Sequence, residues 1–433
     1  MAEQKKIAPL QKGLHGEVSI PGDKSVSHRS VMLASLGSTP VRITNFLQAQ
    51  DCLSTVACMK ALGAGITMQE DGSLTVQGHG LHGLQEPEGI LDAGDSGTML
   101  RLMMGLLAPQ PFLSTFTGDA SLHKRPMGRV IEPLAKMGAR IVGRRGNRLL
   151  PITVLPADKP LQGITYEMPV ASAQVKSALL LAGLYADGET TIIEPYTSRD
   201  HTERMLKAFG VPVEQSGTRV ALRRVEKLEA PAAIEVPGDI SSAAYWLVAA
   251  SIIEGSDVLL KNVGVNPTRT GILDVLQDMG AYIVRLNEHV SGGEPMADLR
   301  VRSAKLHGTS FGAEIMPRLI DEIPILAVAA MFAEGTTVIT GAGELRVKET
   351  DRLQAVVDQY NKLAPCIEGQ EDGLIIHGPA ILKNAACFSY DDHRIAMSLA
   401  IAGAAGAGVT IENAACVNIS YPEFYTTLSG LTK

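Results

Sequence analysis

Short polar phrases alternate with longer apolar stretches along this chain of 433 residues, and the alternation recurs six times. Each phrase contains Ser, Asp, Arg or Lys, and is followed by an apolar stretch of helical length and then by Gly and a β-branched segment typical of a strand. The phrases open at Gly22, Gly94, Pro169, Pro237, Leu319 and Tyr390. Repeats of roughly 70 to 80 residues are too long for solenoid units and indicate a duplicated α/β module.

The first and third copies show the predicted elements most clearly. In the first, Ser25 or Ser27 can cap a helix that runs to Leu36, Gly37 can end it, and residues 41–46 alternate as a half-buried strand does. In the third, the helix that follows Ser172 is apolar nearly all round, which predicts burial. Its strand follows at 189–193. The later copies repeat this order, with apolar stretches at 241–248, 323–328 and 394–400 and strands at 258–260, 336–339 and 409–411.

Six copies divide most simply into two halves of three. We therefore predict two lobes, residues 22–236 and residues 237–433, with the stretch 226–233 crossing between them. Residues before Gly22 form an extra strand that could join either half. The polar phrases should converge at the functional site.

Composition narrows the class of protein. Hydrophobic residues make up 45% and aromatic residues 4%, so the cores are aliphatic and the protein is an ordinary globular one. The first residues lack the apolar core of a signal peptide and no window is apolar enough to span a membrane, so we expect a cytoplasmic location. Five cysteines without a C-x-x-C motif predict buried thiols rather than disulfides or a zinc ribbon.

The net charge of −7 argues against a general nucleic-acid surface, yet positive charge is concentrated in the polar phrases. Arginine forks bind carboxylate and phosphate, and helix N-termini favour anions, so these phrases suit a polyanionic substrate. The alternative is that the Ser and Asp residues only cap helices and the cations form a solvated, salt-bridged face. The basic clusters are Lys24 with Arg29, Lys124 and Arg125 with Arg129, and Arg346 to Arg352.

Two carboxylates are placed for proton transfer, Asp321 in the fifth copy and Glu349 in the last basic cluster. A carboxylate among Arg and Lys has a lowered pKa, which suits a base, although either residue could instead be an ion-pair partner. The spacing predicts that Lys348 and Arg352 share one helical face, with Glu349 beside Arg352. Walker A, H-E-x-x-H, G-x-S-x-G and EF-hand motifs are not present in the sequence, so ATPase, zincin, serine hydrolase and calcium-site functions are not indicated.

Six motifs occur together: residues 22–29 (GDKSVSHR), Gly97 and Thr98 with Arg101, 124–127 (KRPM), 172–174 (SAQ), 346–352 (RVKETDR) and 392–394 (DHR). Over nearly the whole chain they resemble the EPSP synthases, or 3-phosphoshikimate 1-carboxyvinyltransferases. The phrases at 124–127 and 198–203 are similar to the bacterial group termed class II.

The resemblance implies the enolpyruvyl transferase fold, an inside-out α/β barrel of two lobes with three βαββαβ repeats each, and an active site in the cleft between the lobes. It places residues 1–21 with 237–433. It also implies that the 5-hydroxyl of shikimate 3-phosphate attacks phosphoenolpyruvate, whose methylene is protonated before phosphate leaves. It implies no cofactor, no metal, no nucleic acid or membrane partner, and a monomer.

The resemblance also implies a role for each matching residue. Asp321, Glu349 and Lys24 would be catalytic, with Asp321 as the base for the hydroxyl and Glu349 exchanging the methylene proton near Lys24. His393 could support Arg394 only. Shikimate 3-phosphate would be bound by Lys24, Ser25, Arg29, Ser172, Ala173, Gln174, Arg199, Asp321 and Lys348. Phosphoenolpyruvate would be bound by Lys24, Gly97, Arg125, Gln174, Arg352 and Arg394.

Two departures from the family pattern concern phosphoenolpyruvate. Asp95 stands where Asn is common, and its charge should weaken anion binding unless a cation such as Lys124 or Arg125 pairs with it. The phrase 417–422 (VNISYP) lacks a lysine that many relatives carry there.

Three alternatives remain at this point. UDP-N-acetylglucosamine enolpyruvyl transferase has a reactive loop cysteine that residues 118–126 lack. RNA 3′-phosphate cyclase should show a nucleotidyl-accepting histidine and a more basic surface. A non-enzymatic scaffold would bind anions without turnover. The fourth phrase, at 237–242, carries no ligand that the resemblance assigns.

Overall fold

The computed structural model describes residues 4–431 as two units of α/β structure. Unit 1 contains the chain up to Pro21, Gly238–His289 and the chain from Pro295 onward, and unit 2 contains Gly22–Pro237 and Val290–Glu294. The crossing is therefore at Pro237, and our expectation for 226–233 was wrong. That stretch runs into a strand at Ala233–Glu235 that pairs in parallel with Val41–Thr44 of unit 2.

Unit 2 contains the first three copies. Its strands are β3 (Val41–Thr44), β4 (Gly65–Met68), β5 (Leu74–Gln77), β6 (Leu91–Asp92), β7 (Ser114–Thr117), β8 (Arg140–Gly143), β9 (Leu149–Leu155), β10 (Thr165–Glu167), β11 (Glu189–Ile193), β12 (Glu214–Ser216), β13 (Arg219–Arg223) and β14 (Ala233–Glu235). Its helices are α1 (Lys24–Leu36), α2 (Gln50–Ala61), α3 (Gly97–Leu107), α4 (Gly128–Lys136), α5 (Arg144–Asn147), α6 (Ala173–Gly183) and α7 (His201–Ala208), with the 3₁₀ turn η1 (Leu122–Lys124).

Unit 1 contains the other three copies and both N-terminal strands. Its strands are β1 (Lys5–Ile7), β2 (His15–Ser19), β15 (Asp257–Gly264), β16 (Tyr282–Ser291), β17 (Glu294–Arg302), β18 (Ser310–Phe311), β19 (Gly335–Ile339), β20 (Ile367–Gly369), β21 (Leu374–Gly378), β22 (Ala385–Phe388) and β23 (Val409–Glu412). Its helices are α8 (Ile240–Ile252), α9 (Gly271–Asp278), α10 (Met316–Leu319), α11 (Ile323–Phe332), α12 (Arg352–Leu363), α13 (His393–Ala405) and α14 (Phe424–Gly430), with the 3₁₀ turns η2 (Ile320–Glu322), η3 (Gly343–Val347) and η4 (Ala414–Ile419).

The second repeat illustrates the topology that the copies share. Helix α3 connects the parallel strands β6 and β7, because a parallel pair needs a long crossover. Helix α4 then leads to the antiparallel hairpin of β8 and β9, and β9 pairs with β7. The chain order is thus βαβαββ and differs from the expected βαββαβ in the position of the second helix. In residues 4–431 this pattern gives five four-stranded sheets and one three-stranded sheet.

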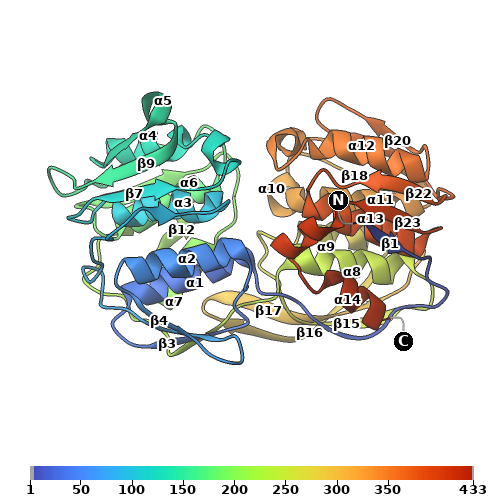
Figure 1. Ribbon diagram of the computed structural model, residues 1–433, viewed down its shortest axis with the longest axis horizontal. Coiled ribbons are helices and arrows are strands. Elements are labelled where there is room, and N and C mark those ends of the chain that lie inside the picture. Colours follow the sequence, from blue (N-terminus) through green and yellow to red (C-terminus); the bar gives the residue numbers. More distant parts are fainter. Residues whose placement is uncertain (1–3, 432–433) are drawn as a thin grey trace. The chain divides into compact units, whose positions relative to one another are not determined.

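Three helices form the interior of each unit, as Figure 1 shows for α8, α11 and α13 and for α1, α3 and α6. These helices are buried almost all round, as their uniform apolar character predicts. Because the sheets lie outside them, only the helix ends can bring polar groups to a common surface. The starts of these helices coincide with five of the six polar phrases, and the phrase at Leu319 comes just before α11.

The N-terminus of α1 differs from our expectation. The helix begins at Lys24, so Ser25 and Ser27 lie within it, and Asp23 is the cap, accepting a hydrogen bond from the Val26 amide at 2.9 Å. Ser27 instead accepts one from the Leu47 amide at 3.1 Å. The predicted C-terminus is confirmed, with Gly37 as the C-cap.

Candidate active site

Lys24 is the first residue of α1 and is held by a buried carboxylate. Its Nζ forms a salt bridge with Asp51 of α2, whose side chain is 2% exposed, whereas that of Lys24 is 40% exposed. Asp51 thus fixes one end of a cation that still faces solvent. Asp51 is not among the predicted site residues, because nothing in the spacing of residues 24 and 51 indicates their contact.

His28, one turn further along α1, is buried and links three helices. Its Nδ1 is 2.6 Å from the Thr55 hydroxyl of α2, and its Nε2 is 3.3 Å from Ser96, the N-cap of α3. Burial, with the cations Lys24 and Arg29, holds the pKa of His28 well below its usual value. The neutral ring therefore acts as a structural connection.

Arg29 is buried and held by three oxygen atoms. Its Nε donates to Thr202 Oγ1 at 2.7 Å, Nη2 to Ser177 Oγ at 2.7 Å, and Nη1 to the Ser25 carbonyl at 2.9 Å. Burial lowers the pKa of Arg29 to about 10, partly opposed by the nearby Glu203 carboxylate, so it remains charged at neutral pH. These three acceptors are uncharged, so the positive charge of Arg29 is available to a bound anion.

The N-terminus of α6 carries three predicted ligands in succession. Ser172 caps the helix, its hydroxyl accepting from the Val175 amide at 3.4 Å, and Ala173 is the first helical residue. Gln174 is oriented by two contacts with α3: its Oε1 accepts from Arg101 at 2.7 Å and its Nε2 donates to Thr98 at 2.9 Å.

Arg101 belongs to the family motif but was not assigned a ligand. Burial, followed by the positive charges of Arg129 and Arg125, lowers its pKa to about 9. The close approach of three guanidinium groups is unfavourable without an anion, so this region favours one. Gly97 contributes space, because a Cβ there would lie 2.8 Å from Arg101 Nη1 and 3.6 Å from Arg125 Nη1.

Arg199 and Asp95 also belong to unit 2. Arg199 is half-buried on the loop before α7. Asp95 is half-buried just before α3, and in residues 4–431 neither Lys124 nor Arg125 forms a salt bridge with it. The pairing that would compensate its charge is therefore not found.

In unit 1 the cations are held by carboxylates. Arg352, the first residue of α12, is 1% exposed, and its Nε donates to Asp392 Oδ2 at 2.8 Å. Its Nη2 donates to Glu349 Oε2 at 2.6 Å, and its Nη1 is 3.5 Å from Asp321 Oδ1. In the sequence Asp392 appears only as part of the motif 392–394. The contact between Asp392 and Arg352 was not predicted.

The remaining predicted residues of unit 1, Lys348 and Arg394, contact Asp321. Lys348 Nζ lies 3.8 Å from Asp321 Oδ1, and Arg394 Nη1 donates to the Asp321 carbonyl at 3.1 Å and lies 3.7 Å from Glu322 Oε1. The structure therefore brings Asp321, Lys348, Glu349, Arg352 and Arg394 together. The nearby acidic groups, Asp321 first among them, raise the pKa of Arg394 despite its burial.

The helical face predicted for 348–352 was wrong. Lys348 caps the end of η3, and α12 begins only at Arg352, because Asp351 is its N-cap and accepts from the Gln354 amide at 3.0 Å. Glu349 lies in the bend before α12 and still reaches Arg352, so their expected contact is present. Although burial opposes it, Arg352 and then His393 lower the pKa of Glu349 to about 2, which makes it a carboxylate at neutral pH.

The fourth phrase, which had no assigned ligand, forms an internal network. Asp239 caps α8 by accepting from the Ser241 amide at 2.9 Å and also accepts from Arg269 at 3.1 Å. Ser241 accepts from Arg269 at 2.9 Å and donates to Glu322, which in turn lies beside Arg394. Through Ser241 and Glu322, this phrase is therefore linked to Arg394 of the cluster in unit 1.

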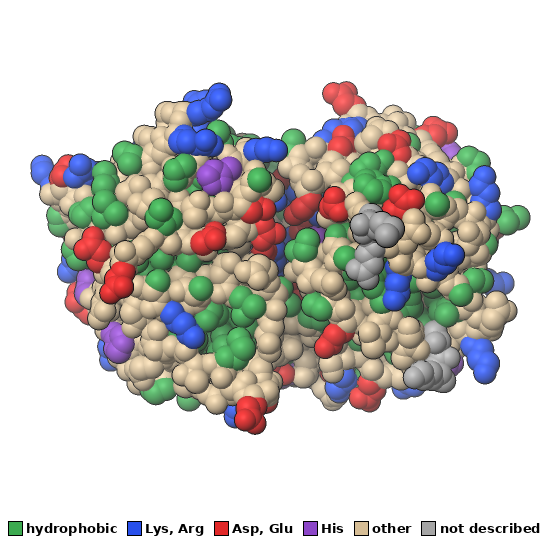
Figure 2. Space-filling view, in the orientation of Figure 1, with side chains coloured by type: hydrophobic (Ala, Val, Ile, Leu, Met, Phe, Trp, Pro, Cys, Tyr) green, Lys and Arg blue, Asp and Glu red, His purple; other side chains and the backbone are tan. Residues whose placement is uncertain are grey.

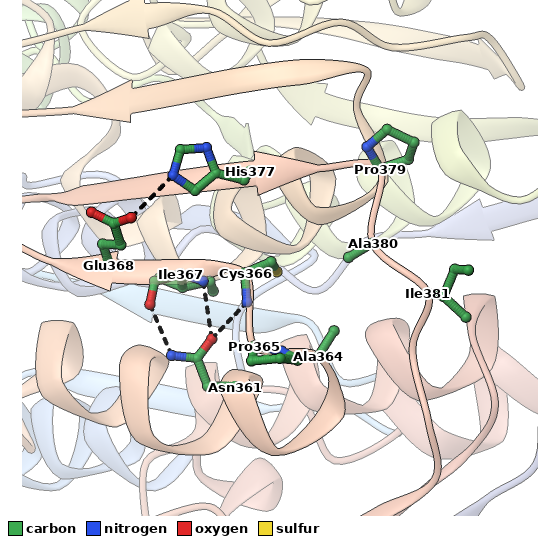
Figure 3. Close-up of a pocket in the computed structure, with 10 residues that line it drawn as sticks. All are labelled: Asn361, Ala364, Pro365, Cys366, Ile367, Glu368, His377, Pro379, Ala380 and Ile381. Atoms are coloured by element: carbon green, nitrogen blue, oxygen red, sulfur yellow. Dashed lines mark hydrogen bonds and ion pairs between the residues drawn. The ribbon is translucent and has the colours of Figure 1, made fainter.

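A cavity of about 530 Å³ lies elsewhere in unit 1 (Figure 3). It is lined by the end of α12, by β20 and β21 and by the loop after Pro379, and His377 there is 3.3 Å from Glu368. None of the predicted site residues lines it. In residues 4–431, no helix is long and apolar enough to cross a membrane, and no three His, Cys, Asp or Glu side chains are grouped to hold a metal.

Comparisons with known proteins give a consistent result. Residues 10–428 match the family model described as EPSP synthase (3-phosphoshikimate 1-carboxyvinyltransferase). The 3-phosphoshikimate 1-carboxyvinyltransferase of Desulforamulus reducens is 52% identical over 419 residues, covering 96% of this chain and 97% of the relative. The enzyme of that name from Desulforudis audaxviator is 53% identical over 427 residues, covering 98% and 99%.

Solved structures agree. A structure of EPSP synthase from Acinetobacter baumannii has a TM-score of 0.92 at 44% identity and covers 99% of this chain and 98% of its own. The enolpyruvyl transferase NikO from Streptomyces tendae has a TM-score of 0.79 at 19% identity, with 100% and 98% covered, and shares the fold.

Proposed function

Because the chain belongs to the EPSP synthase family, we propose that its two polar clusters, one in each unit, together bind the two anionic substrates of the family's reaction. The chain has the enolpyruvyl transferase fold and catalyses that reaction. The enolpyruvyl group of phosphoenolpyruvate is transferred to the 5-hydroxyl of shikimate 3-phosphate, and phosphate is released, in the shikimate pathway to aromatic amino acids. UDP-N-acetylglucosamine enolpyruvyl transferase activity is not favoured.

One observation carries the proposal: four cations in the first two turns of α1, α3 and α12 are held in place by other side chains. Lys24 has Asp51, Arg29 has Thr202 and Ser177, Arg101 has Gln174, and Arg352 has Asp392. Groups held in this way need little reorganisation when an anion binds, so they can stabilise charge that develops during the reaction. A solvated salt-bridged face would leave these side chains mobile and exposed.

We assign shikimate 3-phosphate to both clusters. In unit 2 its ligands are Lys24, Ser25, Arg29, Ser172, Ala173, Gln174 and Arg199, and in unit 1 they are Asp321 and Lys348. The support is that Arg29 of α1 donates to Ser177 near the start of α6 and to Thr202 at the start of α7, each at 2.7 Å. A guanidinium held close to helix N-termini suits a ligand that carries a phosphate and a carboxylate.

We assign phosphoenolpyruvate to Lys24, Gly97, Arg125, Gln174, Arg352 and Arg394. The support in unit 2 is the close group of Arg101, Arg125 and Arg129 around Gly97, where the crowded positive charges favour an anion. In unit 1 the charge of Arg352 is already balanced by Asp392 and Glu349. Binding of phosphoenolpyruvate there therefore competes with Glu349.

This competition gives Glu349 a chemical role. As a carboxylate at neutral pH, Glu349 can remove the methyl proton when the tetrahedral intermediate eliminates phosphate. When a substrate anion binds Arg352, the charge that holds the pKa of Glu349 low is neutralised, which moves the group toward the acid that first protonates the methylene. Asp321, close to Lys348 and Arg352, is the base for the 5-hydroxyl, and Lys24 balances charge at the reacting carbon.

Phosphate release tests the function. With phosphoenolpyruvate present, release should depend on shikimate 3-phosphate, and release with only UDP-N-acetylglucosamine as acceptor would overturn the assignment. Arg29→Gln should raise the KM for shikimate 3-phosphate, and Arg125→Gln that for phosphoenolpyruvate. Arg42→Gln is the matched control, because Arg42 of β3 is exposed and pairs with the exposed Asp71 in the turn between β4 and β5.

We also propose that the enzyme is a cytoplasmic monomer. The five cysteines are free thiols, as expected of a reducing compartment. On the face shown in Figure 2 the exposed apolar side chains form small separate groups rather than one broad patch. Light scattering on the purified protein tests the oligomeric state, and a dimer mass would contradict it.

A further inference from the structure

A fully buried ion cluster in unit 2 has no part in the reaction assigned above. Lys176 of α6 is 0% exposed, and its Nζ lies 2.6 Å from Glu194 Oε2 and 2.7 Å from Glu203 Oε1, both carboxylates being at most 1% exposed. Its Nζ also donates to the Ser198 carbonyl at 3.4 Å. Burying three charges is costly unless they are paired, so a cluster of this kind needs a structural or functional reason.

The ion cluster and the two hydroxyls that accept from Arg29 come from adjacent residues of the same two helices, α6 and α7. Helix α6 contributes Lys176 to the cluster and the next residue, Ser177, to Arg29. Helix α7 contributes Thr202 to Arg29 and the next residue, Glu203, to the cluster. The contact between Lys176 and Glu203 therefore fixes how the two helices align, and with it the 2.7 Å contact between the Ser177 and Thr202 hydroxyls.

The hydroxyl pair meets one edge of the Arg29 guanidinium. Nε and Nη2 donate to two oxygen atoms that are themselves 2.7 Å apart, much as they would to a carboxylate. Unlike a carboxylate, the hydroxyls orient the guanidinium without neutralising it. With the Ser25 carbonyl, the two hydroxyls accept one N–H from each of Nε, Nη1 and Nη2 of Arg29. Within residues 4–431, one N–H on Nη1 and one on Nη2 are therefore available to a ligand.

We propose that Ser177 and Thr202 are positioning residues that orient Arg29 toward shikimate 3-phosphate, and that the cluster of Lys176, Glu194 and Glu203 fixes the two helices that carry them. The proposal rests on the assignment of Arg29 to shikimate 3-phosphate. It adds that specificity for this substrate depends on two hydroxyls and an ion cluster that do not touch it.

The test is Thr202→Val, which keeps the shape of the side chain and removes the acceptor for Nε. The KM for shikimate 3-phosphate should rise ~10- to 100-fold, as for loss of a hydrogen bond to a charged group, while the KM for phosphoenolpyruvate is unchanged. Thr202→Ser should restore the wild-type value. Thr190→Val is the matched control, since Thr190 is a buried threonine of β11 whose hydroxyl has no partner within residues 4–431. It should leave both constants unchanged.

The outcomes separate the proposals. Equal changes in both KM values, or no rescue by Thr202→Ser, would indicate a merely structural role and overturn the inference. An Arg29→Gln variant with a normal KM for shikimate 3-phosphate would overturn the assignment of Arg29 itself. An impaired Arg29→Gln beside an unaffected Thr202→Val would overturn only the inference. If Thr202→Val does not fold, Ser177→Ala, which removes the Nη2 acceptor, must show the same selective rise or the inference fails.

Discussion

Removal of the Lys176 ammonium is the perturbation whose stability effect the structure defines most sharply. In Lys176→Met the two carboxylates that lie 2.6 and 2.7 Å from Nζ stay buried without their cation. Breaking a buried ion pair by removing one partner costs ~3–5 kcal/mol. For a unit of this size each kcal/mol corresponds to about 2–4 °C, so the melting temperature of unit 2 should fall by roughly 6–20 °C.

Two comparison variants make the measurement specific. Lys227→Met removes an exposed cation whose Nζ is 3.4 Å from Glu229, and an exposed pair of this kind is worth ~0–1 kcal/mol. Adding Glu203→Gln to Lys176→Met removes one of the two uncompensated charges, so the double variant should be more stable than additivity predicts, by ~0.5–3 kcal/mol. Urea unfolding followed by circular dichroism measures five proteins: the wild type, Lys227→Met, the single variants Lys176→Met and Glu203→Gln, and the double variant.

The effect of Lys176→Met should also depend on pH. Burial raises the pKa of Glu203, and Lys176 opposes that rise. Without Lys176 the folded protein therefore binds a proton at Glu203 more readily than the unfolded chain does, and stability falls as pH increases. The variant should be closer to wild type at pH 5 than at pH 8. A loss below about 1 kcal/mol at pH 8, or strict additivity in the double variant, would refute the argument that these charges depend on one another.

Four further predictions concern the reaction, acid stability and the thiols. Asp95→Asn should lower the KM for phosphoenolpyruvate, because this carboxylate near the anion site lacks a salt bridge to Lys124 or Arg125; an unchanged KM contradicts this. Glu349→Gln should lower kcat by ~10²–10⁴-fold in steady-state assays, as expected for loss of a proton-transfer group, and a kcat near wild type would remove Glu349 from that role. The pKa of Glu349 is lowered to about 2, so its pairing with Arg352 stabilises the folded protein at pH values above the ordinary pKa of a glutamate. This stabilisation is lost as pH falls from about 4 toward 2. Acid titration of the wild type and of Glu349→Gln would detect the loss. Iodoacetamide at pH 7.5 should leave activity intact, since burial raises the pKa of Cys58 to about 12 and those of Cys387 and Cys416 to about 11; rapid inactivation would point to a reactive thiol.

The sequence was sufficient where one local pattern determines one element. The strands at 189–193 and 336–339 and the end of α1 at Gly37 follow from β-branched runs and from glycine after an apolar helix. The helical face expected at 348–352 failed because i,i+4 spacing has meaning only inside a helix, and Asp351 starts the helix four residues after Val347 ends the preceding turn.

Contacts between distant residues could not be predicted in the same way. Asp51 reaches Lys24 and Asp392 reaches Arg352 because of how helices pack, which leaves no trace in the local pattern. The same is true of Val290–Glu294, the tip of the β16–β17 hairpin, which joins unit 2 where Ser291 accepts from the Glu235 amide at 2.8 Å. A single sequence identifies the cations of the site, but the groups that hold those cations become visible only in the folded chain.

Helix capping and cation binding, which a sequence presents as alternatives, are performed here by the same carboxylates. Asp392 caps α13 with Oδ1, which accepts from the Arg394 amide at 2.8 Å, and holds Arg352 with Oδ2. Asp351 likewise caps α12 with Oδ1 and accepts from Arg346 with Oδ2 at 2.8 Å. A carboxylate has acceptor sites for both contacts, so a capping Asp, as at the starts of α1, α8, α12 and α13, needs only one nearby arginine to hold substrate-binding charge as well. In the fourth phrase that arginine is Arg269, which faces Asp239 inside the unit, and this explains how a repeat can keep the shared phrase and support a neighbouring cluster without binding a ligand of its own.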